Sequence, residues 1–560
     1  MYKYLRLVFW MGLFGLCTAQ ALAQAVDTAW VRRFNGVMNS SDGGSAIAVD
    51  HSGHVYVAGY TIGSGTYDDY LTIKYKSNGD TAWVRTYNGT DNFKDRASAI
   101  AIDNSGRVYV TGSSYGSGTN SDYVTIKYHI NGDTAWVRRY DGPASGSDLA
   151  KAIAVDDSGF VYVTGYSYSS GTSDDYATIK YHPNGDTAWV RRYNGPGNSY
   201  DDAYAIALDS SGNVYVTGYS YGSGTSTDYA TIKYEPNGDT AWVRRYNGPG
   251  NLWDVATAIA LDASGNVYVT GYSYGSETTN DYATIKYHPN GNTAWVRRYD
   301  GPYNQVDNAN AIAVDDSGNV YVTGLSTESG IASDYATIKY ASNGDFLWVR
   351  RYIGPGNNHD EAKALAIDGS GNVYVTGYSY GSGTSKDYAT IKYASSGDTI
   401  WVARYDGPVN STDSACAVAV DDSGNVYVTG SSIGDGTSED CTTMKYVQSP
   451  SDVEDETESF RKPSEFALSQ NCPNPFNPNT TIKFKVQGSK FKAPVLATLK
   501  IYNILGQKVR TLVDEPKWAG DYSVQWDGMN DKGEQLSSGI YFYQLKVGEY
   551  TSSKKMVLLK

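Results

Sequence analysis

The residues of the sequence that are best placed to do chemistry are a set of aspartates that recurs every 53 residues. Its members are Asp42, Asp95, Asp148, Asp201, Asp254, Asp307, Asp360 and Asp413. If the repeats form a ring, these carboxylates would surround the mouth of its channel, where converging oxygens could bind Ca²⁺. Calcium needs about six oxygen ligands, and no compact calcium-binding motif occurs in the sequence. An Asp beside a turn more often accepts backbone N–H groups, so a capping role without metal or cofactor is favoured.

Two residues beside these aspartates differ from their counterparts in the other repeats. Trp253 precedes Asp254, and His359 precedes Asp360. They could mark a single pocket, although drift in an exposed loop is the favoured interpretation. The sequence contains no nucleophile elbow, no zinc-protease helix, no phosphate-binding loop and no pair of cysteines two residues apart. Because the repeats scarcely depart from one another, we assign no catalytic residue and expect a protein that is not an enzyme.

The elements that would position these residues are defined by eight regularly spaced tryptophans. They are Trp30, Trp83, Trp136, Trp189, Trp242, Trp295, Trp348 and Trp401, again 53 residues apart. A fixed period of this length is typical of an array whose units bury their apolar faces against neighbouring units. The spacing therefore predicts a repeat protein.

Within one repeat, four short runs rich in β-branched and aromatic residues are separated by turn residues. For the fifth repeat they cover residues 240–246, 258–262, 266–273 and 281–287. Four antiparallel strands make one blade, and eight blades lie within the range of β-propellers. With 258–262 innermost and 240–246 outermost, the last blade lacks its outer strand. We expect the strand around Trp30 to supply it by pairing with residues 443–446.

The two ends of such blades should differ. The short Ser-Gly-Asn and Asn-Gly turns lie at one end, and long loops such as 247–256 and 272–280 lie at the other. These loops are rich in Tyr, Ser, Gly, Asn and Asp, which is typical of adaptable recognition surfaces but also of ordinary soluble loops. The sequence leaves both interpretations open.

Four segments are expected along the 560 residues. Residues 1–23 have basic residues, an apolar run and a small-residue cleavage site, as in a secretory signal peptide. Residues 24–447 form the propeller, 448–465 an acidic linker, and 466–560 a sandwich of alternating strands. Three cysteines remain after the signal peptide, namely Cys416, Cys441 and Cys472. We expect Cys416 and Cys441 to be free thiols rather than a disulfide, since their strands lie too far apart.

Charge and hydropathy restrict the partners. A formal net charge of −14 argues against nucleic acid, which requires a basic face. No apolar run after the signal peptide approaches the ~18 residues needed to span a bilayer, so no transmembrane segment is expected in the mature chain.

Two parts of the chain resemble known families. The repeats, for instance Ala205-Ile-Ala-Leu-Asp-Ser-Ser-Gly-Asn-Val-Tyr-Val-Thr-Gly218, resemble the bacterial SBBP β-propeller repeats across all eight periods. Residues 466–560 resemble a type IX secretion sorting domain of type A. The motifs that carry this second resemblance are Pro473-Asn-Pro-Phe-Asn-Pro478, Ile501-Tyr-Asn-Ile-Leu-Gly506, Trp526-Asp-Gly528 and Ser538-Gly-Ile-Tyr-Phe-Tyr543. Cys472 departs from the family, which commonly has a Tyr before Pro-Asn-Pro-Phe.

The resemblance to the sorting domain implies an immunoglobulin-like sandwich that is recognised by the type IX secretion machinery of a Gram-negative bacterium. The expected protein is therefore secreted or held at the outer cell surface. Our leading hypothesis is a non-enzymatic binding or structural module that recognises an extracellular protein or glycan through its long loops. The alternative is an extracellular glycan-directed lyase or hydrolase with its site at the propeller axis.

Overall fold

The computed structural model describes residues 26–448 except 329–331. It also describes residues 466–558, except 469–470, 472–475, 477–478, 487–493, 505, 519 and 549. The predicted signal peptide, most of the predicted linker and Cys472 lie outside the described residues. The chain divides into two compact units, up to Ser451 and from Asp452. Among the described residues, no helix is long and apolar enough to cross a membrane.

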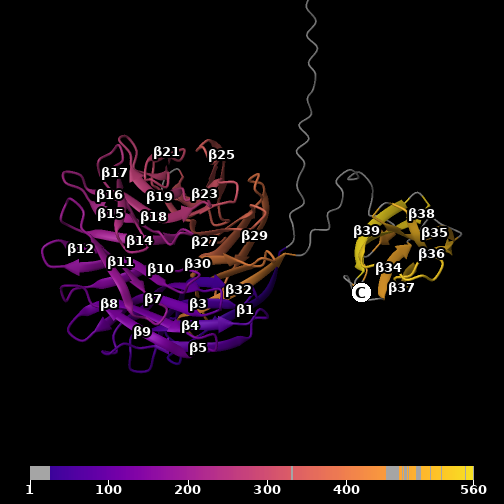
Figure 1. Ribbon diagram of the computed structural model, residues 1–560, viewed down its shortest axis with the longest axis horizontal. Coiled ribbons are helices and arrows are strands. Elements are labelled where there is room, and N and C mark those ends of the chain that lie inside the picture. Colours follow the sequence, from indigo (N-terminus) through magenta and orange to yellow (C-terminus); the bar gives the residue numbers. More distant parts are fainter. Residues whose placement is uncertain are drawn as a thin grey trace, which may run out of the picture. The chain divides into compact units, whose positions relative to one another are not determined.

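The first unit consists of eight four-stranded antiparallel sheets (Figure 1). Each sheet has one inner strand, and these are β2 (Gly43–Val49), β6 (Asp95–Ile102), β10 (Asp148–Val155), β14 (Asp201–Leu208), β18 (Asp254–Leu261), β22 (Asp307–Val314), β26 (Glu361–Ile367) and β30 (Asp413–Val420). The second strands are β3 (Val55–Ile62), β7 (Val108–Gly116), β11 (Val161–Ser169), β15 (Val214–Tyr221), β19 (Val267–Tyr274), β23 (Val320–Thr327), β27 (Val373–Tyr380) and β31 (Val426–Ile433).

The third strands are β4 (Asp68–Tyr75), β8 (Asn120–Tyr128), β12 (Ser173–Tyr181), β16 (Thr227–Tyr234), β20 (Asn280–Tyr287), β24 (Ser333–Tyr340), β28 (Lys386–Tyr393) and β32 (Glu439–Gln448). The outer strands are β5 (Thr81–Tyr87), β9 (Thr134–Tyr140), β13 (Thr187–Tyr193), β17 (Thr240–Tyr246), β21 (Thr293–Tyr299), β25 (Phe346–Tyr352), β29 (Thr399–Tyr405) and β1 (Val26–Phe34). In Figure 1, outer strands such as β5, β9, β17 and β21 lie around the circumference, while β10, β14, β18 and β30 lie nearer the middle.

The strand around Trp30 completes the last sheet, as the sequence predicts. β1 pairs with β32 from Val26 opposite Gln448 to Phe34 opposite Cys441. The same strand also contacts the first sheet, because the Trp30 indole N–H donates to the carbonyl of Ser77 at 3.3 Å. The ring of Trp30 packs against Tyr75 of the first sheet and Tyr427 of the last. β1 therefore joins the two sheets that are farthest apart in sequence.

Neighbouring sheets pack through buried aromatic and branched side chains. In the cluster between the fourth and fifth sheets, Tyr215 and Trp242 pack against Val267 and Ile285. Trp242 also donates its indole N–H to the carbonyl of Pro289 in the next sheet, at 3.2 Å. The same bond, from a tryptophan to a carbonyl 47 residues on, recurs in six other junctions, for example from Trp189 to Pro236. Trp401 is the exception among the described residues, because its indole N–H has no hydrogen-bond partner. Successive tryptophans that make this contact are 53 residues apart, so the period of the sequence reflects one such contact at each of these junctions.

A second repeated contact neutralises a buried aspartate within each of seven sheets. In the fourth sheet, the Arg245 guanidinium lies 2.7 Å from Asp228, and it donates to Ser220 and to the Tyr193 hydroxyl of the preceding sheet. We call this group the arginine clamp. Its seven arginines are Arg33, Arg139, Arg192, Arg245, Arg298, Arg351 and Arg404.

The first sheet, β2–β5, lacks the clamp. Thr86 stands where the other sheets have the arginine, and Phe34 of β1 stands where they have the tyrosine. The corresponding aspartate, Asp69, is only 7% exposed and keeps one carboxylate oxygen without a hydrogen bond. Burial raises the pKa of Asp69, and so do the nearby carboxylates. Both ends of the clamp are thus missing together at the junction that β1 forms.

The inner strands begin earlier than the sequence pattern predicted. In the fifth repeat the strand was expected at 258–262, but β18 starts at Asp254. Its first residues pair with β19, with Asp254 opposite Ser273, and a β-bulge follows between Ala256 and Ala258. The same bulge recurs in all eight inner strands. It divides each inner strand into a regular core segment and a short first segment at the long-loop end.

The second unit is an immunoglobulin-like pair of sheets. One contains β33 (Phe466–Leu468), β34 (Thr480–Val486) and β37 (Gly520–Trp526), and the other contains β36 (Lys508–Lys517), β35 (Val495–Asn503), β38 (Gly539–Val547) and β39 (Tyr550–Leu558). Their core includes Ile482, Leu499, Trp526 and Tyr543. The sandwich of alternating strands predicted for residues 466–560 is therefore confirmed.

Candidate functional site

The eight repeated aspartates hold the turns that lead into the inner strands. Each carboxylate accepts the backbone N–H of a glycine six residues earlier, as from Gly195 to Asp201 at 2.6 Å. The donors in the other sheets are Gly36, Gly89, Gly142, Gly248, Gly301, Gly354 and Gly407. In five sheets the second oxygen accepts another backbone N–H, such as that of Tyr221. The side chains are at most 1% exposed, so they face the turns and not solvent.

Replacing two of these aspartates tests the capping role. We expect Asp201→Ala with Asp254→Ala to lower the free energy of unfolding by about 2 to 5 kcal/mol, because buried backbone N–H groups lose their acceptors. Denaturation of the full chain with and without Ca²⁺ measures this loss. Exposed Asp422 provides the control, and Asp422→Ala should change little. A Ca²⁺-dependent rise in the melting temperature that disappears in the double variant would instead identify a metal site.

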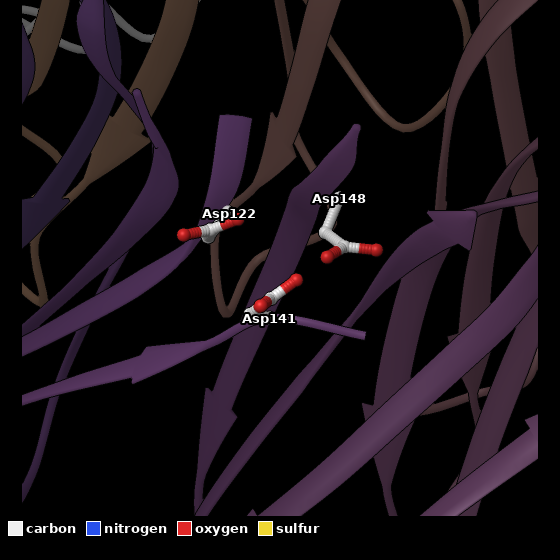
Figure 2. A group of neighbouring side chains, drawn as sticks. All are labelled: Asp122, Asp141 and Asp148. Carbon is white, nitrogen blue, oxygen red and sulfur yellow. The ribbon is translucent and has the colours of Figure 1, made fainter. Parts of the chain in front are cut away.

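Three groups of acids come close together near the same turns. Asp122, Asp141 and Asp148 offer oxygens within 4.8 Å of one another (Figure 2), and Asp281, Asp300, Asp307 and Asp387, Asp406, Asp413 do the same. In the first group, Asp122 lies 2.6 Å from the Arg139 guanidinium, and Asp148 accepts the Gly142 N–H. The arginine clamp and the turn cap thus already use two of the three carboxylates, and the clamp brings a positive charge to the group. This arrangement is unfavourable for a cation.

The two residues singled out beside these aspartates have different surroundings. The ring of His359 is exposed, and its Nδ1 lies 3.1 Å from the Ser333 hydroxyl. Trp253 is 56% exposed. Among the described residues, its indole makes no hydrogen bond and no ring contact. Trp253 lines a pocket, which is described below.

A group of residues at which the repeats do differ was not predicted from the sequence. They occupy the positions one before, one after and three after the capping aspartate, and we call them the variable ring. The first position holds Ser41, Lys94, Ser147, Tyr200, Trp253, Val306, His359 and Thr412. The second holds Gly43, Arg96, Leu149, Asp202, Val255, Asn308, Glu361 and Ser414. The third holds Ser45, Ser98, Lys151, Tyr204, Thr257, Asn310, Lys363 and Cys416.

Backbone geometry explains why these positions belong together. They are two residues apart, so the alternation of a strand places them on one face, while the aspartate and the following small residue face the other way. The third position is the bulged residue, and bulges re-aim side chains. Asn310 and Cys416, for example, donate to backbone carbonyls of the next inner strand, Ala362 and Gly44. Aligning the eight repeats position by position would have revealed this alternation.

The charged members of the variable ring form local pairs. Lys151 lies 3.4 Å from Asp202, and Lys363 lies 2.7 Å from Glu361. Arg96 lies 2.6 Å from Asp68 and stacks over the ring of Tyr60. Tyrosines and amides surround these pairs, as where the Tyr378 hydroxyl donates to Glu361 at 2.9 Å. The ring thus offers aromatic faces, hydrogen-bonding groups and balanced charges, the chemistry of a recognition surface.

Asp202 is the most perturbed acid of the ring. It is 5% exposed, and one of its oxygens has no hydrogen bond among the described residues. Burial raises its pKa to about 6, while the nearby Lys151 acts in the opposite direction. The folded protein therefore holds this proton more tightly than the unfolded chain, whose Asp has a pKa near ~3.9. The resulting stabilisation is complete below about pH 4 and is lost as the pH rises through about 6.

We expect Asp202→Asn to remove this pH dependence. At pH 7.5 the variant should be more stable than the wild type by about 1 to 2 kcal/mol, because it buries no charge, and the difference should vanish near pH 4. Urea denaturation from pH 4 to 8 measures the effect, with Asp422→Asn as the exposed control. A variant less stable than the wild type at pH 7.5 would show that the ion pair with Lys151 outweighs the cost of burial.

Pockets occur at both ends of the inner strands. At the short-turn end, a pocket of about 430 Å³ lies among turn residues such as Asp315, Asn319, Asp368 and Gly371. At the long-loop end, a pocket of about 330 Å³ opens between the fourth and fifth sheets. It is lined by Tyr200, Tyr219, Tyr221, Thr227, Trp253, Val255, Tyr272 and Asn280. Three of these residues belong to the variable ring.

Comparison with known families identifies both types of module. The SBBP β-propeller repeat matches residues 136–171, 188–224, 241–277, 294–332, 347–383 and 403–436. The FlgD Ig-like domain matches residues 479–553. The chain thus contains β-propeller repeats followed by an immunoglobulin-like domain, in agreement with the sheets described above.

Similarity to individual proteins is low. An uncharacterized WD repeat-containing protein of Acanthamoeba polyphaga mimivirus is 22% identical over 460 residues, which cover 65% of this chain and 31% of the relative. The chain thus spans about a third of that relative's length. PorZ, a surface component of the type-IX secretion system of Porphyromonas gingivalis, is 12% identical with a TM-score of 0.30, over 92% of this chain and 81% of PorZ. The extracellular region of plexin A4 is 9% identical with a TM-score of 0.38, over 94% of this chain and 61% of plexin.

Proposed function

We propose that the chain is an eight-bladed β-propeller that acts as a non-enzymatic binding module, with its ligand at the variable ring. The observation that carries this proposal is where the repeats differ. Turn tips such as His51 and Asp316 also vary, but they are exposed, and exposed turns tolerate substitution. The variable ring includes buried strand residues such as Asp202 and Val255, and variation there needs another cause. Ligand recognition supplies that cause, because it requires different side chains around one site.

The sheets support the closed form of the propeller. Each inner strand packs against the next, and β2 of the first sheet packs against β30 of the last. β1 adds the outer strand of the last sheet. Eight such blades would bring the long loops and the variable ring around one end of a channel, which is a frequent place for ligand sites.

We further propose that the protein is secreted or displayed on the outer surface of a Gram-negative bacterium. Residues 1–23 have the composition of a signal peptide. Residues 466–560 carry the ordered motifs that resemble a type IX sorting domain, and the match to an Ig-like domain suits that role. The type IX secretion machinery would then be the partner of the second unit.

One observation favours a catalytic role as the second candidate. Asp202 has a pKa raised to about 6, which suits proton transfer near neutral pH. Its pairing with Lys151 and its burial favour a structural group instead. Turnover of a bound glycan by the wild type, abolished in Asp202→Asn, would support the enzyme.

An array of bacterial and host glycans and extracellular proteins tests the binding function. The probe is the full chain without residues 1–23. His359→Ser and Trp253→Ser place at each position a residue that other repeats already have there, so they should preserve the fold. Lys151→Ser is combined with Asp202→Asn, so that no buried charge is left without its partner. We expect at least one of these variants to reduce binding to the array by about tenfold or more, as hot-spot residues do.

The controls His51→Ala and Asp316→Ala lie in short turns at the opposite end and should bind like the wild type. Equal binding by all variants would contradict a site at the variable ring.

A further inference from the structure

We propose that the pocket between the fourth and fifth sheets binds a neutral saccharide. The inference rests on the proposed function, because it assigns a ligand class to one part of the variable ring. Three properties of the pocket support it: exposed aromatic faces, a buried hydroxyl without a partner, and the absence of charged side chains from the lining residues.

The walls of the pocket are aromatic. Trp253 and Tyr200 are 56% and 51% exposed, although burial of either ring would be favourable. The Tyr200 and Tyr221 rings stand 6.3 Å apart on one side, and Tyr219 and Tyr272 complete the lining. The face of an aromatic ring carries partial negative charge. The C–H groups on one face of a pyranose ring are weakly positive and can stack on such a surface.

A buried hydroxyl in the lining lacks a hydrogen-bond partner. Thr227 is the first residue of β16 and is only 5% exposed, and its Oγ1 bonds to no described residue. An unsatisfied buried hydroxyl is costly and rare in folded proteins. Nearby, the Asn280 amide donates to Asn308 at 3.2 Å, which leaves its carbonyl oxygen as an acceptor. A ligand with several hydroxyl groups could bond to the Asn280 carbonyl oxygen, and it would gain the Thr227 hydroxyl once that side chain turns toward the pocket.

The lining residues also indicate a neutral ligand. None of them carries a charge, and the nearest charged members of the variable ring, Lys151 and Asp202, neutralise each other. An acidic sugar or a phosphate would find no cation in the pocket. A quaternary ammonium group would be attracted to the aromatic rings, but it has no group to bond with Thr227 or Asn280. A neutral saccharide uses both the rings and the polar groups.

This pocket should occur once in each chain. The position before the capping aspartate holds a Tyr or Trp only in these two consecutive repeats, as Tyr200 and Trp253, while the others have Ser41, Lys94, Ser147, Val306, His359 and Thr412. The aromatic pair can therefore flank only the junction between the fourth and fifth sheets. We expect one saccharide bound per chain.

Isothermal titration calorimetry of the full chain without residues 1–23 tests this inference. The probes are neutral hexasaccharides of glucose, mannose, xylose, galactose and N-acetylglucosamine, compared with hexagalacturonate and choline. We expect one-to-one binding of at least one neutral hexasaccharide. Trp253→Ala should weaken it by about tenfold or more, and Thr227→Val by about fivefold. Phe346→Ala removes an exposed aromatic elsewhere and Thr240→Val an exposed Thr of the same sheet, and both should bind within twofold of the wild type.

Three results would overturn the inference: no binding of any neutral hexasaccharide, saccharide binding that survives both pocket substitutions, or Trp253-dependent binding of choline or hexagalacturonate alone. These results are distinguishable from failure of the proposed function. If array binding depends on Lys151 or His359 while no neutral hexasaccharide binds, the saccharide inference is wrong and the binding function of the variable ring remains. If no ring substitution affects the array, both are wrong.

Discussion

Deletion of residues 26–34 is expected to abolish cooperative folding of the propeller repeats or to lower their melting temperature by more than about 10 °C. The deletion removes β1, which is hydrogen-bonded to β32 along its whole length. It also removes Trp30, which is 7% exposed, and leaves Tyr75, Tyr427 and Cys441 uncovered. The loss combines an exposed strand edge with a large cavity between the first and last sheets. Differential scanning calorimetry of the full chain measures it.

A single substitution makes the same test in a chain that still folds. Trp30→Ala should cost about 3 to 5 kcal/mol, the usual range for truncation of a buried tryptophan. Trp518 of the second unit is 61% exposed, so Trp518→Ala should leave the free energy of unfolding of the repeats unchanged. If the deletion and Trp30→Ala both leave the melting transition within about 2 °C of the wild type, β1 does not hold the first and last sheets together.

The second large effect is expected at the arginine clamp. Arg245→Ala should lower the free energy of unfolding by about 3 to 5 kcal/mol, because it leaves a buried charge without its partner. Asp228 is 5% exposed, and its Oδ2 bonds to the guanidinium while its Oδ1 already lacks a partner. The substitution also removes the hydrogen bond to Tyr193 of the preceding sheet. Urea denaturation of the full chain measures the loss.

A double-mutant cycle separates the charge from the packing. Adding Asp228→Asn to Arg245→Ala should restore about half of the lost stability, because the buried group is then neutral. Arg245→Lys keeps the charge but not the planar fork, and it should lie between the wild type and Arg245→Ala. If Arg245→Ala costs less than about 1 kcal/mol, the clamp behaves as an ordinary surface ion pair.

The architecture could be predicted from the repeat because each strand has a position at which nearly all repeats carry the same type of residue. The spacing of Trp30 and its counterparts predicted the sheets, and the staggered ends of the repeats predicted the pairing of β1 with β32. Cys416 and Cys441 are free thiols, also as predicted. These features follow from local propensity and from the burial of large side chains, both of which can be recognised in the sequence.

The site could not be predicted in the same way. The repeats were expected to differ scarcely at all, and beside the repeated aspartates only Trp253 and His359 were recognised as exceptions. The prediction placed the start of the inner strand at 258, whereas β18 begins at Asp254, so Trp253 and Val255 were assigned to a loop. Thr227 and Tyr272 lie in other strands, and only the packing of two sheets brings them to the same pocket. Contacts of this kind depend on tertiary structure and have no local pattern.

The missing arginine clamp beside β1 has a consequence for synthesis and assembly. During translation β1 is synthesised before the other strands of the array, whereas its partner β32 ends only at Gln448. β1 therefore remains unpaired until β32 has been synthesised. The junction that it completes carries Thr86 and Phe34 instead of the clamp, and it joins residues that are more distant in sequence than those of any other junction. Contacts of such long sequence separation form late, after the loop-closure entropy has been overcome. While β1 is undocked it could insert into the last sheet of another molecule, so at high protein concentration this junction is where strand-swapped dimers would arise.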